Sequence, residues 1–261
     1  MKRIIALILT VVMAVAALVS CGGPVEDIAR VKENGKIIVG VTVYEPMDYK
    51  DENDEWIGFD AELAQQFAET LGVECEIVII NWDRKVAELR AKEIDLVWNG
   101  MTATEKLGKK IDFSVSYAKN AQVAVVKKGS AIKAADVATS TIAVEGGSAG
   151  ATVAEETIKA ESINKVGAQV DALNEVLAGT SQVAVVDITM AQSVVGKGTY
   201  ADLEILEGAS YGDEIFAVGL RRGSDLKAEL DAFLKAKYED GTLEALAEKY
   251  SVGLNTEALG E

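Results

Sequence analysis

Residues able to bind a small polar molecule lie just beyond several apolar, strand-like runs of the chain. Thr42–Pro46 follows the first run, Asn81–Trp82 the second and Asn99–Thr104 the third, while Glu145–Gly150 and Asp187 follow two later runs. In open parallel sheets, ligands bind beyond the carboxyl ends of strands, where loops and helix N-termini converge. These segments therefore predict a ligand site assembled from several loops.

Two of these places suggest how a ligand would be held. In Gly146–Gly150, a glycine-rich turn before a predicted helix could present backbone N–H groups to an anion, although an ordinary strand-to-helix turn fits the same residues. Asp187 ends an apolar strand, and a carboxylate there needs a partner or solvent.

The chain contains no histidine. This absence excludes Ser-His-Asp and Cys-His catalysis and the commonest zinc sites, and we expect neither a metal nor a cofactor. Cys75 lies within the apolar stretch 73–80, where a small core residue is expected rather than a reactive thiol.

The elements that would position these loops alternate between strands and helices. The first series is predicted as strand 36–43, helix 59–71, strand 76–80, helix 85–91 and strand 95–99. In helix 59–71, Phe59, Leu63 and Phe67 recur at helical spacing, and Gly72 ends it. The order βαβαβ predicts a largely parallel sheet.

A second α/β series follows. It is predicted as strand 141–144, a helix to about residue 160, strand 165–166, helix 170–178 and strand 183–187. The chain should cross between the two units near 120–123 and again near 207–211, and helices 226–234 and 243–250 should pack back on the first unit. The absence of a Ser/Pro-rich linker predicts two lobes that share strands.

The N-terminus has the pattern of a signal peptide at 1–20, with a short basic start and an uncharged apolar run from Ile4 to Val19. The ending Leu18-Val19-Ser20-Cys21 resembles a bacterial lipobox, which implies cleavage before Cys21 and a lipid on its thiol. The 26 basic residues less Lys2 and Arg3 leave 24 against 42 acidic ones, a net charge of −18. Nucleic acid and anionic membrane surfaces are therefore poor partners.

Four blocks of the chain resemble, in order and spacing, the polar amino-acid family of periplasmic solute-binding proteins, family 3. They are VGVTVYEPMDYKDENDEWIGFDAELAQQFAETLGV, NGMTATEKLGKKIDFSVSYAKNAQVAVVKKG, IAVEGGSAG and LKAKYEDGTLEALAEKY. The resemblance implies an α/β, two-lobed, type II periplasmic-binding-protein-like fold with two hinge crossovers. Its expected parts are a tether at 21–35, lobe 1 at 36–121 and 210–250, lobe 2 at 122–209, and a C-terminal tail at 251–261.

The resemblance also implies roles for individual residues. Tyr44 and Trp82 would contact the ligand side chain, while Gly100 and Thr102, with Asn99 beside them, would hold its carboxylate and amine. Ser148 and Ala149 would hold the carboxylate from the second lobe, and Asp187 would pair with the α-ammonium group. Glu145 lies nearby and would add negative charge.

One position departs from the family pattern. Three residues after the second threonine of Thr102-Ala103-Thr104, the family places an arginine that binds the ligand carboxylate bidentately. Leu107 occupies that position. A pocket with acidic and aromatic groups but without this arginine favours a cation, so anionic amino acids such as glutamate should be disfavoured.

The predicted protein is a monomeric lipoprotein outside the cytoplasm, anchored to the membrane through Cys21. It would capture a neutral or cationic amino acid, or a related amine, for an ABC transporter permease. A ligand-binding sensor would need the same closed, liganded form. A dehydratase-like enzyme on this fold would use Glu145 or Asp187 as an acid, but no second catalytic group is evident.

Overall fold

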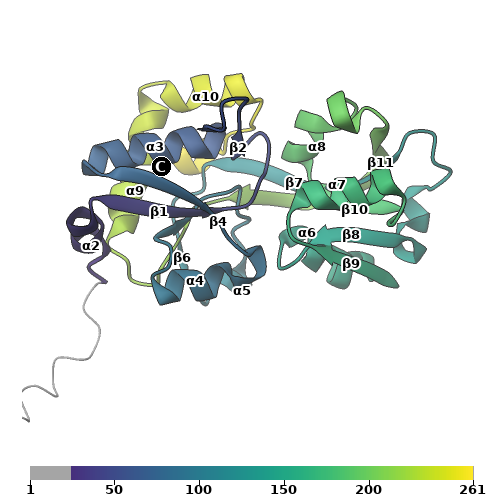
Figure 1. Cartoon of the computed structure of the whole chain (residues 1–261), viewed down its shortest axis with the longest axis horizontal. Helices are drawn as coiled ribbons and strands as arrows, with labels where there is room; N and C mark the ends of the chain where they lie inside the picture. The colour runs from purple at the N-terminus through teal and green to yellow at the C-terminus, as the bar shows by residue number, and fades with distance from the viewer. Residues whose placement is uncertain (1–24, 261) are drawn as a thin grey trace, which may run out of the picture.

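The computed structural model describes residues 25–260 and consists of two α/β lobes side by side (Figure 1). The predicted signal peptide at 1–20 and the predicted lipidation site Cys21 lie outside the described residues. Within residues 25–260, no helix combines the length and hydrophobicity needed to span a membrane.

The first lobe is built on a five-stranded sheet of order β4-β1-β5-β12-β6. Helices α3 and α10 lie on one side of this sheet, and α4 and α5 on the other (Figure 1). The elements are α2 (Asp27–Asn34), β1 (Lys36–Val41), β2 (Tyr49–Lys50), β3 (Trp56–Ile57), α3 (Phe59–Leu71), β4 (Glu74–Ile79), η1 (Trp82–Arg84), α4 (Lys85–Ala91), β5 (Leu96–Val97), α5 (Glu105–Gly108), β6 (Asp112–Phe113), β12 (Gly219–Leu220), α9 (Leu226–Glu239), α10 (Thr242–Tyr250) and α11 (Thr256–Leu259).

The second lobe is built on another five-stranded sheet, of order β11-β7-β10-β8-β9. Its elements are β7 (Ala118–Lys127), η2 (Ala134–Thr139), β8 (Thr141–Glu145), α6 (Ala149–Thr152), the π-helical turn η3 (Val153–Ile158), β9 (Ser162–Val166), α7 (Gln169–Ala178), β10 (Val183–Asp187), α8 (Ile188–Val194), η4 (Gly198–Tyr200) and β11 (Leu203–Phe216).

Both sheets are mixed, whereas the sequence predicted a largely parallel arrangement. Strands β4, β1 and β5 are parallel to one another, as are β10, β8 and β9. Strand β12 runs antiparallel to its neighbours in the first sheet, and β7 and β11 do so in the second. These antiparallel strands belong to the segments by which the chain passes from one lobe to the other.

Strands β7 and β11 pair along their length, from Leu203 beside Lys127 to Phe216 beside Ala118. Their ends reach the first lobe, where Phe216 bridges to Thr102 and Ala118 bridges to Leu254. The lobe boundaries expected at 121/122 and 209/210 therefore fall inside these two strands. Together they form the double connection between the lobes.

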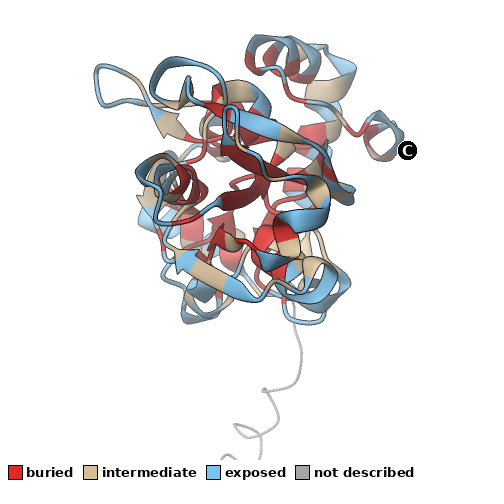
Figure 2. Ribbon diagram, turned by 90° about the vertical axis from the view of Figure 1, so that its right-hand side faces the viewer, coloured by how far each residue is buried: buried red, intermediate tan, exposed pale blue. Residues whose placement is uncertain are grey.

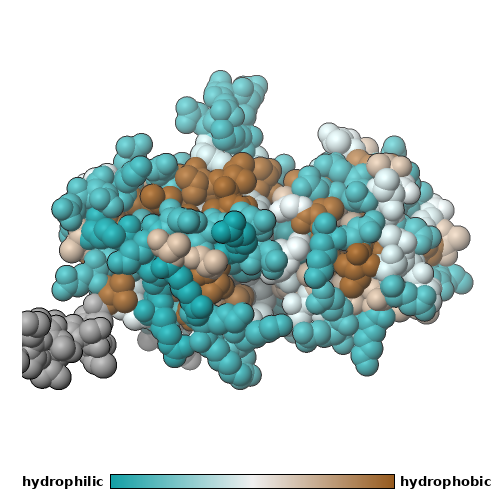
Figure 3. Space-filling view, turned by 60° about the horizontal axis from the view of Figure 1, so that its bottom comes forward, coloured by the Kyte–Doolittle hydropathy of each residue, from teal (hydrophilic) through white to brown (hydrophobic). Residues whose placement is uncertain are grey.

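Most residues of the core are apolar, and Figure 2 shows buried residues in the interior and exposed residues on the outside. In the first lobe, Phe67 of α3 packs against Trp98 and Phe233, with ring centroids 6.3 and 5.3 Å apart. The face seen in Figure 3 is largely hydrophilic, with smaller hydrophobic patches. This surface accommodates the strong negative charge of the chain in solvent.

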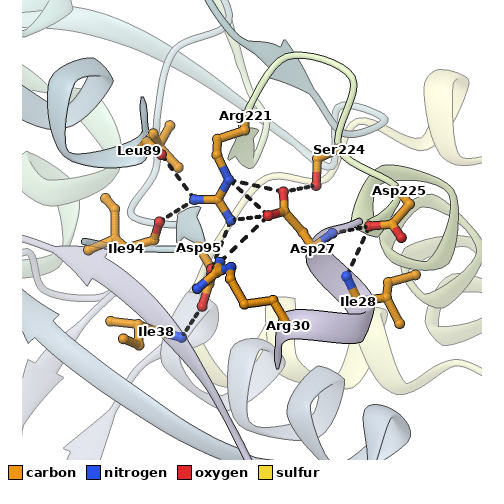
Figure 4. Close-up of polar contacts among 10 residues, drawn as sticks. All are labelled: Asp27, Ile28, Arg30, Ile38, Leu89, Ile94, Asp95, Arg221, Ser224 and Asp225. Carbon is orange, nitrogen blue, oxygen red and sulfur yellow. Dashed lines mark hydrogen bonds and ion pairs between the residues drawn. The ribbon is translucent and has the colours of Figure 1, made fainter. Parts of the chain in front are cut away.

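Part of the segment assigned to the tether is an ordered helix. Residues 27–34 form α2, and Asp27 at its start accepts hydrogen bonds from the Arg221 guanidinium and the Ser224 hydroxyl (Figure 4). Arg221 also donates to Asp95, 2.8 Å away, and Asp95 pairs with Arg30. The helix is ordered because these buried charges fasten it to the first lobe.

The C-terminal segment 251–260 is also packed against the first lobe. Its residue Leu259 is buried in helix α11, and Asn255 donates its side-chain amide to the Ser116 hydroxyl at 2.7 Å. The segment was expected to be a C-terminal tail. A few buried contacts are enough to hold it in place.

Candidate functional site

A cavity of about 60 Å³ lies between the two lobes. It is lined by loops at the carboxyl ends of the parallel strands, as the sheet rule predicted. Eight of the residues predicted for the site line it: Trp82, Asn99, Gly100, Thr102, Glu145, Ser148, Ala149 and Asp187. Leu107, which occupies the position of the family arginine, lines the same cavity.

Tyr44 is the predicted residue that the structure does not bring to the cavity lining. Its ring is buried against Gly100, where an added Cβ would lie 2.7 Å from the tyrosine Cε1. Gly100 has φ +53°, a backbone conformation that favours glycine, so both its shape and its lack of a side chain admit the ring. Burial, with the charge of Asp187, raises the pKa of the Tyr44 hydroxyl well above its usual value, so a ligand contact of Tyr44 stays a prediction.

The turn at Asn99 and Gly100 is held from behind by two buried acids. The Asn99 amide donates to Asp48 at 2.7 Å, and its oxygen accepts from the Thr42 N–H and hydroxyl, both at 3.0 Å. The Gly100 N–H donates to Asp60 at 2.6 Å. Burial raises the pKa of Asp60 to about 7. The Asn99 side chain is thus used within the first lobe, where it positions the cavity wall.

Trp82 forms an apolar side of the cavity. It begins the short helix η1, whose preceding residue Asn81 accepts a hydrogen bond from the Asp83 N–H. Its ring packs in a buried cluster that includes Leu89 and Leu107. The leucine thus extends the apolar wall at the position where an arginine would have provided charge.

Asp187 ends β10 at the floor of the cavity and accepts hydrogen bonds from three side-chain amides. Asn120 donates at 2.6 Å and Gln169 at 2.6 Å, and Gln122 donates to the same oxygen as Asn120. Burial, with the nearby charge of Glu214, raises the pKa of Asp187 to about 6 despite these amides. Amide dipoles satisfy its hydrogen bonds but do not neutralise its charge.

Glu145 ends β8 and is buried beside Asp187. Its Oε1 atom has no hydrogen-bond partner among the described residues. Burial raises its pKa to about 8, and the charge of Asp187 adds to this effect. Neither Glu145 nor Asp187 forms an ion pair with a described residue, so the site has unsatisfied capacity for a cation.

Several residues of the site were missed by the sequence analysis. Lys85 lines the cavity from the start of α4. Asn120 and Gln122 alternate along β7 and are buried, and Glu214 accepts hydrogen bonds from both and from Thr102. Lys85 could have been found because it shares the buried helix face with Leu89. Asn120 and Gln122 could have been found because they interrupt an apolar strand.

The lobes touch each other across the cleft. Gly147 approaches Asp83 so closely that an added Cβ would lie 2.6 Å from the carboxylate Oδ1 and 2.8 Å from the Cα. The Ser193 hydroxyl donates to Glu45 at 3.4 Å on another side of the cleft. These contacts hold the two lobes together around the cavity. Among residues 25–260, no group of three or more acidic, cysteine or histidine side chains is arranged to hold a metal ion.

Two α/β lobes, joined by two strands around one enclosed polar cavity, define the class of two-lobed, type II solute-binding proteins. Residues 37–253 match the bacterial extracellular solute-binding proteins, family 3, and the chain belongs to this family. The sequence resemblance and the fold class are thus confirmed.

Named relatives and solved structures support the same assignment. The chain is 32% identical to the L-cystine-binding protein TcyJ of Escherichia coli, over 85% of this chain and 84% of the relative. It is 29% identical to the arginine-binding extracellular protein ArtP of Bacillus subtilis, over 91% and 93%. A mutant of ArgBP from T. maritima superposes with a TM-score of 0.80 at 30% identity, over 85% and 98%. This chain is a binding protein and not an enzyme.

Proposed function

We propose that this protein captures an amino acid with a neutral or cationic side chain, or a related amine, for an ABC importer. The observation that carries the proposal is the pair of buried carboxylates, Glu145 and Asp187, which face the cavity without an ion-pair partner among the described residues. An ammonium group entering between them would gain charge-assisted hydrogen bonds that the empty site lacks.

The balance of charge indicates which side chains the ligand should carry. Asp187, Glu145 and Lys85 line the cavity. Burial gives Glu145 a pKa of about 8, so it is largely protonated near pH 7 without ligand, but a ligand cation beside it would favour its ionised form. A ligand with an acidic side chain would instead disfavour the ionised forms of Glu145 and Asp187, and Leu107 offers it no guanidinium. Relatives named for cystine and arginine agree with such a preference.

Capture would depend on movement of the lobes about β7 and β11. Asp187 and Glu145 lie on one lobe, and Trp82 and Thr102 on the other, so a ligand contacts both only when the lobes are together. It would therefore bind the closed state better and shift the population toward it.

The proposed location follows from the two ends of the tether. Lipid at Cys21 would anchor the protein outside the cytoplasm, and the chain is already fastened to the first lobe at Val25, whose N–H donates to the Gly223 carbonyl at 2.8 Å. A monomer held this close to the membrane would meet a permease directly. Replacing Cys21 with serine should move the protein from the membrane fraction to the soluble fraction, whereas retention in the membrane would contradict the lipid anchor.

The ligand preference can be tested by calorimetric titration of the purified, refolded protein. L-arginine, L-lysine, L-histidine, L-glutamine, L-cystine and L-glutamate form a suitable panel, together with agmatine. We expect one or more of the neutral or cationic compounds to bind and glutamate not to bind. Tight binding of glutamate would contradict the proposal.

Transport and sensing differ in what cells lose with the protein. If the protein feeds an importer, deleting it should abolish high-affinity uptake of the titrated ligand. Normal uptake combined with loss of a transcriptional or motility response to that ligand would instead identify a sensor.

A further inference from the structure

Lys85 is a buried cation at the edge of the cavity. It is the only basic side chain among the described residues that line the cavity, and it is 4% exposed. It stands at the start of α4 on the same face as the buried Leu89, so the helix directs it inward. No described carboxylate lies within ion-pairing distance of its ammonium group.

The Lys85 ammonium is held by groups from both lobes. It donates to the Trp82 carbonyl at 3.0 Å and to the Gly147 carbonyl at 2.8 Å, and it lies 4.6 Å from the centroid of the Trp82 ring. An ammonium group has three donors, and these two carbonyls use two of them. Burial lowers the pKa of Lys85 to about 8, although the charges of Glu145 and Asp83 act in the opposite direction.

The surroundings of Lys85 coincide with the place where the family arginine is missing. Leu107 and Lys85 line the same cavity, and both contribute to the wall around Trp82. The carbonyl that Lys85 binds belongs to Gly147, directly before Ser148 and Ala149, which the family resemblance assigns to the ligand carboxylate. The cavity thus has a positive edge at Lys85 and a negative floor at Glu145 and Asp187.

We infer that Lys85 is the carboxylate anchor of this cleft, binding the anionic group of an amino acid in place of the arginine replaced by Leu107. The inference rests on the proposed function and adds a residue that decides between amino acids and amines. The third ammonium donor would bind the ligand carboxylate while Asp187 binds the ligand ammonium. A lysine provides a point charge rather than the two-pronged fork of a guanidinium, so preference for the carboxylate should be real but moderate.

Pairs of an amino acid and the amine left by its complete decarboxylation, which removes one carboxylate from arginine, lysine and histidine and two from cystine, test this role. The pairs are L-arginine with agmatine, L-lysine with cadaverine, L-histidine with histamine and L-cystine with cystamine. For the pair that binds, the wild type should prefer the amino acid. Lys85→Met keeps the approximate length of the side chain and removes its charge. It should reduce the preference for the amino acid by about 10- to 100-fold, chiefly because the amino acid binds less tightly.

Two further variants separate anchoring from a purely structural role. Lys85→Arg retains the charge and should keep the preference for the amino acid. Lys85→Met combined with Leu107→Arg should regain it, because the charge returns from the position used by the family. Circular dichroism and thermal melting of each variant establish that it is folded before titration.

The possible results distinguish this inference from the proposed function. If Lys85→Met weakens the amino acid and its amine equally, or leaves both unchanged, Lys85 is not the anchor even though the protein binds amino acids. If the wild type binds the amine more tightly than the amino acid, the anchor is likewise refuted. Failure of the wild type to bind any of the four pairs or L-glutamine would contradict the proposed function, and this inference with it.

Discussion

The pKa values of two buried aspartates, Asp27 and Asp187, are shifted in opposite directions. Asp27 lies in the α2 charge cluster, which we define as Asp27, Arg30, Asp95 and Arg221 (Figure 4). Burial alone would raise the pKa of Asp27, yet hydrogen bonds from Arg221 and Ser224 bring it below its ordinary value. The pKa of Asp187 is raised to about 6, although three amides donate to it.

The difference shows that hydrogen bonding and charge neutralisation are separate requirements. The α2 charge cluster contains two acids and two arginines, so each carboxylate has a cation beside it. The cleft holds Glu145 and Asp187 against a single lysine, which bonds to backbone carbonyls instead. A cluster that is complete holds the fold together, and one that lacks a cation is suited to bind one.

Removing the cation from the complete cluster should have the largest effect. Arg221→Met would leave the buried Asp27 and Asp95 with only the partly exposed Arg30 as a cation, and should lower the free energy of unfolding by about 3–5 kcal/mol. Urea denaturation measures this change. Arg222→Met is the matched control, because the neighbouring Arg222 is exposed and donates only to the Lys109 carbonyl. Equal stability of the two variants would contradict a structural role for the cluster.

Removing charge from the incomplete cluster should affect binding instead. Asp187→Asn should make the binding free energy of the ligand less favourable by about 2–5 kcal/mol, because the ligand ammonium would be buried without its counter-ion. Calorimetric titration measures the loss. Asp213→Asn, which changes an exposed acid on β11, should bind like the wild type. Unchanged affinity in Asp187→Asn would remove this carboxylate from the site.

The pH dependence of stability distinguishes the two clusters as well. Asp187, Asp60 and Glu145 have folded-state pKa values of about 6, 7 and 8, above those of unfolded carboxylates near 4. Their contribution to stability is full below about pH 4 and is lost as the pH rises through 6 to 8. The ligand-free protein should therefore lose stability steadily between pH 5 and 8.5, as urea denaturation can measure.

Asp27 has the opposite sign. Its pKa is lowered in the folded protein, so its contribution is present above about pH 4 and is lost as the pH falls below that value. Asp187→Asn should accordingly flatten the decline above pH 5, whereas the response in strong acid should remain. If the stability of the ligand-free wild type rose from pH 5 to 8.5, the cleft acids could not be buried without a neutralising cation.

The smallest expected effect comes from holding the lobes apart. Gly147 has φ +73° and no room for a Cβ beside Asp83, so Gly147→Ala should impede closure and weaken ligand binding about tenfold. The adjacent Gly146 has no contact closer than 3.7 Å at the equivalent point, and Gly146→Ala serves as the control. Small-angle scattering should show less compaction with ligand in Gly147→Ala. Identical compaction in both variants would contradict this role of Gly147.

Much of the fold could be predicted from the spacing of apolar residues and from the residues that end helices and strands. Helices 59–71 and 85–91 and strand 183–187 have the predicted bounds, because apolar spacing marks their buried faces and glycine or a polar residue ends them. The predicted strand at 95–99 is only Leu96–Val97. There the chain turns at once into Asn99 and Gly100, whose conformation is fixed by distant acids that periodicity does not reveal.

The parts that sequence could not predict depend on contacts between distant residues. Helix α2 is short and polar, and it is stabilised by Arg221, nearly 200 positions away in the chain. Tyr44 follows β1 as expected, but its ring packs against Gly100 and does not line the cavity. The spacing of Lys85 and Leu89 indicates that Lys85 lies on the buried face of its helix, but the Gly147 carbonyl that binds it comes from the second lobe and is not evident in the sequence.

The most direct test of the account is the identity of the ligand that co-purifies with the protein. Mass spectrometry of the small molecules released on denaturation measures it without a choice of candidates. The unpaired carboxylates Glu145 and Asp187 predict a molecule that carries an ammonium group and no net negative charge. Release of glutamate, aspartate or another anion would contradict the central claim that the cleft is completed by a cation.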